Sequence, residues 1–103
     1  MNHGKWEIWA PVQSPGQARD DVAAALGVAA AEVTMQPTLL GGGFGRKSKC
    51  DFAIEAALLS RELGGTAVKV VWTREDDVRH GFYHTATADR FEAGLDASNK
   101  VVA

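Results

Sequence analysis

The spacing of apolar residues along the chain switches between the period of a strand and the period of a helix. "KWEIW" at residues 5–9 is a short aromatic and β-branched run that is typical of a strand. Residues 15–26 then repeat at helical spacing, and their apolar face is formed by Ala18, Val22, Ala25 and Leu26. Ser14 before this segment and Gly27 after it are typical helix end signals. The pattern predicts a strand followed by an amphipathic helix.

The same reading continues to the end of the sequence. Residues 31–40 predict a second strand, which Pro37 interrupts, and residues 49–63 predict a second helix with apolar positions on more than one side. Three further strands are expected at residues 67–72, 85–96 and 101–103. The order β-α-β-α-β-β-β predicts an α+β fold with two main helices packed on a mixed β-sheet. Because strand-like residues lie next to both ends, we expect residues 1–103 to be a single domain that is part of something larger.

Composition narrows the function classes. The chain has 103 residues, 46% hydrophobic and 23% charged, as expected of one ordinary globular domain. Its net charge of −2 argues against a nucleic-acid-binding surface, and no stretch is long and apolar enough for a membrane segment. Residues 1–9 do not resemble a signal peptide, so the compartment, cytoplasmic or periplasmic, stays open.

The single cysteine, Cys50, cannot form an intrachain disulfide. It falls at the start of the second predicted helix, where the helix dipole could lower the pKa of its thiol. Free cysteines more often serve as small buried apolar residues, and we favour that interpretation here. The sequence predicts no catalytic residue and no metal ligand in this chain.

The stretch "LLGGGFGRKSKCD" at residues 39–51 concentrates four glycines between a predicted strand and a predicted helix. Such a loop exposes backbone N–H groups and suits an anion or another group that approaches the main chain closely. As a P-loop it would use Lys47 and Ser48, but Arg46 occupies the position of the second glycine. The dinucleotide-binding glycine pattern also fails. A nucleotide site is therefore the weaker interpretation of this loop.

Four segments together are similar to one family. "EIWAPVQSPGQARDDVAAALGV", "LLGGGFGRK", "DFAIEAALLSRELGG" and "VKVVWTREDD" closely resemble the molybdopterin-binding large subunit of the xanthine dehydrogenase and aldehyde oxidase family. The similarity covers nearly all 103 residues in order and is greatest to the isoquinoline 1-oxidoreductase β subunit branch. In that family the chain is several times longer, so residues 1–103 resemble part of its cofactor-binding region.

This resemblance implies a set of cofactor-binding residues. The family packs the glycine loop against the molybdenum cofactor, which implicates Gly42, Gly43, Phe44, Gly45 and Arg46. It also places a glutamine after the first strand near the molybdenum oxo group, which implicates Gln13. Ser48 stands where xanthine-type members carry a substrate-binding glutamate, so purine oxidation does not fit.

The implied parent enzyme is a molybdenum hydroxylase that oxidises N-heteroaromatic compounds or aldehydes. Its partners would be the remainder of the large subunit and an iron-sulfur subunit that accepts electrons. The family's catalytic glutamate lies beyond residue 103, so we expect the isolated chain to be inactive and to bind no molybdopterin alone. The alternative is a stand-alone α/β protein-interaction module that retains the fold without cofactor and forms a homodimer through open strand edges.

Overall fold

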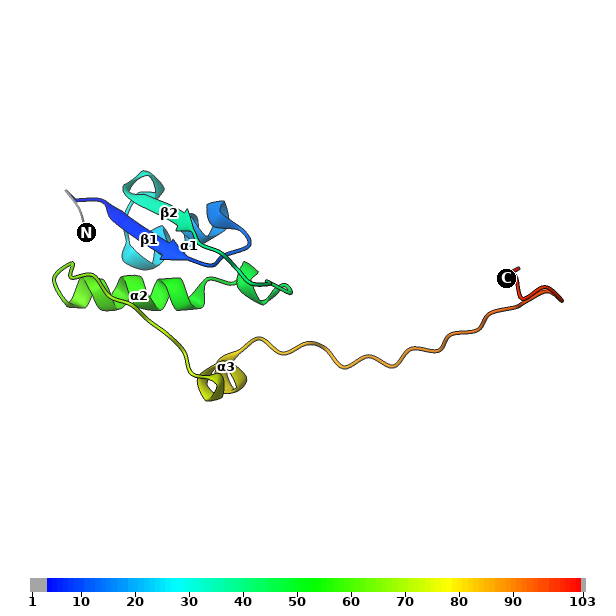
Figure 1. The fold of residues 1–103 in the computed structure, drawn as a ribbon. Coiled ribbons are helices and arrows are strands. Elements are labelled where there is room, and N and C mark those ends of the chain that lie inside the picture. The colour runs from blue at the N-terminus through cyan, green and yellow to red at the C-terminus, as the bar shows by residue number, and fades with distance from the viewer. Residues whose placement is uncertain (1–3, 103) are drawn as a thin grey trace.

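The structure, a computed structural model, describes residues 4–102 and divides into a compact N-terminal half and an extended C-terminal half (Figure 1). Its strands and α-helices are β1 (Trp6–Ala10), α1 (Pro15–Leu26), β2 (Val33–Pro37), α2 (Asp51–Glu62) and α3 (Arg74–His80). Two 3-10 turns, η1 (Ala30–Glu32) and η2 (Arg46–Ser48), precede β2 and α2. No helix within the described residues is long and apolar enough to cross a membrane.

The two strands pair in parallel, with Trp6 opposite Val33 at one end and Ala10 opposite Pro37 at the other. Parallel strands cannot be joined by a tight turn, and α1 provides the crossover between them. Side chains along β1 alternate between buried and exposed, because successive residues of a strand point to opposite faces. Proline cannot donate to a ladder, and Pro37 is the last residue of its strand.

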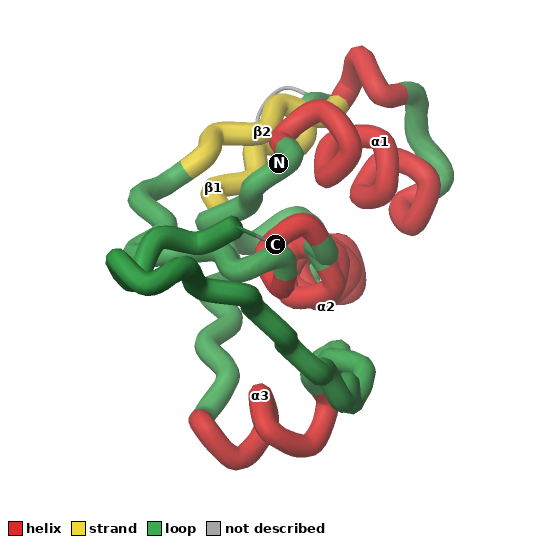
Figure 2. Tube along the Cα trace, turned by 90° about the vertical axis from the view of Figure 1, so that its right-hand side faces the viewer, coloured by secondary structure: helices red, strands yellow, loops and turns green. Residues whose placement is uncertain are grey.

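The core lies between the sheet, α1 and α2. α1 packs against β2 and α2, and α2 packs against β1; Figure 2 shows both helices beside the strands, with α3 set apart. The buried core residues are Trp6, Ile8, Ala10, Val12, Ala18, Val22, Ala23, Leu26, Val33, Cys50, Ala53 and Ala57. Ala53 and Ala57 are small, which lets α2 approach the sheet closely.

The helix predictions agree with the structure. The first helix spans residues 15–26 as expected, and Gly27 ends it in the left-handed conformation with φ 72°. The second begins and ends slightly inside the predicted range of 49–63. Helix α3 is short and is stabilised by a capping box between Thr73 and Asp76. The backbone and hydroxyl hydrogen bonds from Thr73 hold the pKa of the Asp76 carboxyl below its ordinary value.

The α+β class is confirmed, but the predicted mixed sheet is wrong, because the sheet in residues 4–102 is two-stranded and parallel. Residues 67–72 and 85–94 form no strand, and residues 95–101 contribute one antiparallel bridge between Leu95 and Val101. An alternating pattern shows which face a strand would bury, and it does not show that a pairing partner exists. Ala103, the last residue of the predicted strand at residues 101–103, lies outside the described residues.

The C-terminal half leaves many apolar side chains exposed. They are Val71, Val78, Phe82, Tyr83, Phe91, Leu95, Val101 and Val102. The principal extents of the molecule are 72 × 30 × 22 Å, and its radius of gyration is 20.6 Å. A compact domain of this length has a radius of gyration of about 13 Å. The compact fold is therefore confined to the segment that contains β1, α1, β2 and α2.

We expect Val22→Ala to lower the free energy of unfolding by about 2 kcal/mol, because it removes two methyl groups from a fully enclosed site (0% exposed). The matched control is Val71→Ala, the same chemical change at a side chain that is 72% exposed, which should change stability by less than about 0.5 kcal/mol. Urea denaturation measures both. Equal effects would contradict the assignment of α1 to the core.

Candidate functional site

The glycine-rich loop, residues 39–49, is tied to the segment that follows β1. The backbone N–H of Gln13 donates to the carbonyl of Lys47 at 2.8 Å, and the N–H of Thr38 donates to the carbonyl of Ala10 at 3.1 Å. Inside the loop, Lys47 Nζ donates to the carbonyl of Leu40 at 2.5 Å. The loop is therefore closed on itself and anchored beside Gln13.

Four loop residues adopt positive φ angles, which side chains other than glycine rarely tolerate. These angles are 62° at Gly41, 115° at Gly42, 51° at Phe44 and 79° at Gly45. Phe44 is the one non-glycine among them, and its side chain is 86% exposed. The glycines thus serve the special backbone conformation expected from the sequence, and Phe44 is not a core aromatic residue.

A side chain is excluded at Gly43 for a different reason. Its φ is not positive, but a Cβ at this position would lie 2.4 Å from Cδ of Gln13. The exposed side chain of Gln13 therefore lies directly over the Gly43 backbone, and its amide makes no hydrogen bond within residues 4–102. The structure brings together two predicted site residues that are far apart in the sequence.

The backbone N–H groups from Gly41 to Arg46 donate to no acceptor in the described part of the chain. The next three N–H groups are paired, since Lys47, Ser48 and Lys49 donate to carbonyls of the preceding turn. A run of unpaired N–H groups on a positive-φ backbone is suited to a ligand with several acceptor atoms. Together with the free amide of Gln13, this run is the candidate site.

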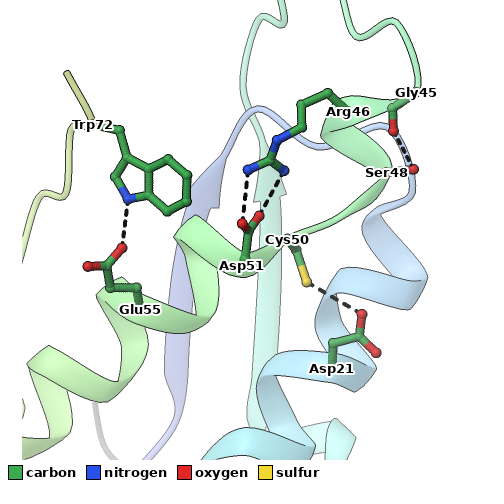
Figure 3. Close-up of polar contacts among 8 residues, drawn as sticks. All are labelled: Asp21, Gly45, Arg46, Ser48, Cys50, Asp51, Glu55 and Trp72. Carbon is green, nitrogen blue, oxygen red and sulfur yellow. Dashed lines mark hydrogen bonds and ion pairs between the residues drawn. The ribbon is translucent and has the colours of Figure 1, made fainter. Parts of the chain in front are cut away.

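The Arg46 side chain does not join this group. Its guanidinium donates two hydrogen bonds to Asp51, both of 2.9 Å, and it lies near three aromatic rings (Figure 3 shows the ion pair and Trp72). Cζ of Arg46 is 5.9 Å from the ring centroid of Phe52, 5.6 Å from that of Trp72 and 5.2 Å from that of Phe82. Of the predicted residues, Arg46 therefore contributes only its backbone to the loop surface.

The geometry argues against a P-loop. Such a loop presents its lysine and its hydroxyl residue to phosphates and magnesium. Here Lys47 Nζ is bonded to the carbonyl of Leu40, and Ser48 Oγ donates to the carbonyl of Gly45 at 2.5 Å (Figure 3). Both side chains are engaged within the loop.

Cys50 is a buried thiol. Burial, together with the neighbouring Asp21, which accepts a 3.5 Å hydrogen bond from Sγ, raises its pKa to about 11 (Figure 3). The helix start does not compensate for these effects. The interpretation as a small apolar core residue is confirmed, and within residues 4–102 no group of three or more His, Cys, Asp or Glu side chains is arranged to hold a metal ion.

Comparison with known proteins gives a consistent result. The model of the molybdopterin cofactor-binding domain family matches residues 1–103. A membrane-bound aldehyde dehydrogenase [pyrroloquinoline-quinone] of Gluconacetobacter polyoxogenes is 37% identical over 100 residues, and an isoquinoline 1-oxidoreductase subunit beta of Brevundimonas diminuta is 38% identical over 101 residues. Each alignment covers 97% of this chain but 13% of the relative, so the chain spans about an eighth of their length. No solved structure matches significantly.

We expect Gly45→Ala to lower the free energy of unfolding by about 1 kcal/mol, because alanine is strained at a φ of 79° although no atom lies within 4 Å of its Cβ. Gly16→Ala is the matched control, since Gly16 lies within α1, has no positive φ and also has nothing within 4 Å. That control should be neutral or stabilising by up to about 1 kcal/mol. Thermal denaturation of both variants tests the loop conformation, and an unaffected Gly45→Ala chain would disprove it.

Cys50 should react slowly with a thiol reagent in the native chain. With a pKa of about 11, only about one thiol in a thousand is ionised at pH 8, and the side chain is buried. We expect alkylation at pH 8 to be at least about 100-fold slower in buffer than in urea. Since the pKa of the folded state lies above the ordinary thiol value of 9.0, this thiol stabilises the fold below pH 9, and that contribution is lost as pH rises towards 11. Rapid alkylation of the native chain at pH 8 would contradict the assignment.

Proposed function

This chain belongs to the molybdopterin cofactor-binding domain family, and we propose that it is a segment of a molybdenum hydroxylase in which the glycine-rich loop contacts the cofactor. The observation that supports this most directly is the run of N–H groups from Gly41 to Arg46, which, like the side-chain amide of Gln13 beside them, have no partner within the described residues.

The residues present are suited to this cofactor. Molybdopterin carries phosphate, sulfur and oxo acceptor atoms, and the loop offers backbone N–H donors without competing carboxylates. We propose that Gly42, Gly43, Phe44, Gly45 and Arg46 contact it through their backbone. Gln13 would donate its side-chain amide to an oxygen acceptor of the cofactor. When bound, the cofactor supplies the two-electron oxidation of the substrate.

The relatives suggest the reaction class. One is named an aldehyde dehydrogenase and the other an isoquinoline 1-oxidoreductase subunit. We propose that the parent enzyme oxidises an aldehyde or an N-heteroaromatic ring. One relative is named a subunit, and we propose an iron-sulfur partner as the electron acceptor; residues 1–103 contain a single cysteine and so supply no set of cluster ligands.

The isolated chain should neither retain the cofactor nor turn over substrate. Tight retention of such a ligand requires a binding free energy of about 10 kcal/mol or more, and one exposed loop does not enclose a ligand enough to provide it. Stoichiometric molybdenum in the chain purified from a cofactor-producing host would disprove this part of the proposal.

One observation favours a second candidate, the stand-alone protein-interaction module. Within residues 4–102 no strand pairs with the outer edge of β1, and the extended C-terminal segment exposes Phe91 and Leu95. Size-exclusion chromatography separates the two candidates. A stable dimer without molybdenum, from a gene that encodes no longer product, supports the module.

Gln13→Ala in the full-length parent should lower turnover by about 100-fold while leaving molybdenum content unchanged, because one donor is removed where charge develops. Gln17→Ala is the matched control. Gln17 is also exposed, but its side chain bonds to Asp21 on the surface of α1, so turnover should be unaffected. Full turnover in a molybdenum-loaded Gln13→Ala enzyme would remove Gln13 from the proposed site.

A further inference from the structure

The Arg46 side chain is the point at which three segments meet. Phe52 belongs to α2, Trp72 precedes α3, and Phe82 follows α3, yet all three rings lie within 6 Å of the guanidinium carbon. We call Arg46, Asp51 and these three aromatic residues the Arg46 box. Neither the sequence motifs nor the family comparison assigns it a role.

The box fixes the orientation of the guanidinium. Arg46 is 21% exposed and Asp51 is 32% exposed, and two parallel N–H···O bonds of 2.9 Å join them in the fork geometry that only arginine provides. Nε of Arg46 is buried and has no hydrogen-bond acceptor within residues 4–102. By contrast, the pair of Arg74 and Asp77 lies on the surface with Arg74 81% exposed, so it imposes little orientation.

Fixing this side chain also fixes the loop, because Arg46 is the first residue of η2. The carbonyl of Arg46 accepts the N–H of Lys49 at 3.3 Å. The carbonyl of the next residue, Lys47, accepts the N–H of Gln13 at 2.8 Å. A rotation of η2 would break the bond to Gln13 and move Gln13 relative to Gly43.

We propose that Arg46 is a positioning residue, held by Asp51 and the aromatic rings, that keeps the Lys47 carbonyl against Gln13 and thereby sets the distance between Gln13 and the glycine-rich loop. The box also anchors α3, which has no buried residue of its own and is flanked by Trp72 and Phe82. This role concerns the geometry of the loop itself, so it holds whether or not the proposed cofactor function is correct.

Amide hydrogen exchange in the ¹⁵N-labelled chain tests the proposal in Arg46→Lys and Asp51→Asn. Arg46→Lys retains the charge but loses the planar fork, and Asp51→Asn retains the shape but loses one acceptor charge. In both we expect the amides of Gln13 and Lys49 to exchange at least about 10-fold faster. The amide of Val12, which is bonded within its own segment to Ala10, should be unchanged.

The matched control is Arg74→Lys, which alters the exposed Arg–Asp pair and should leave the Gln13 amide unchanged. An unchanged Gln13 amide in both box variants would overturn the proposal. So would an equal acceleration of all amides, because that result indicates a general loss of stability. If Arg46→Lys is too unstable to measure, the Asp51→Asn result decides alone.

Discussion

The parallel pairing of β1 and β2 is the constraint on which the candidate site depends. In a parallel pair both strands run the same way, so their carboxyl ends reach the same edge of the sheet. The register brings Ala10 opposite Pro37, and the segments that leave these two residues must therefore start side by side. One carries Gln13 and the other carries the glycine-rich loop. The meeting of Gln13 with Gly43 follows from the topology of the compact half.

The sequence predicted the helices well because helical spacing and end signals are local. Ser14 and Gly27 flank α1, and the structure places that helix where the pattern does, although the Ser14 side chain makes no capping hydrogen bond. The strands after Gly65 were not predicted correctly, because pairing is a property of two segments and the pattern describes only one. Apolar and polar side chains do alternate in residues 85–96, but within the described residues no other segment packs against the apolar ones.

The candidate site was also predicted only where the signal is local in the sequence. The glycine motif and its resemblance to a family pointed to Gln13 and the loop, and the structure brings them together. The partners of Arg46 could not be foreseen in the same way. Its contact with Asp51 joins near neighbours, but Trp72 and Phe82 reach it only through the fold of the segment that contains α3. The Arg46 side chain thus faces other residues of the chain, although the residue itself lies within the predicted binding motif.

The position of the glycine-rich loop in the chain has a consequence for biosynthesis. The unit of β1, α1 and β2 is complete at Pro37, before the ribosome has added the loop, and chains emerge at about 5–20 residues per second. Most contacts of this unit are therefore available while later residues are still being synthesised. The core of this unit is closed only by α2, which follows the loop and packs against α1 and β1. In the order of synthesis, the loop and the closure of the core therefore come after the two strands that pair.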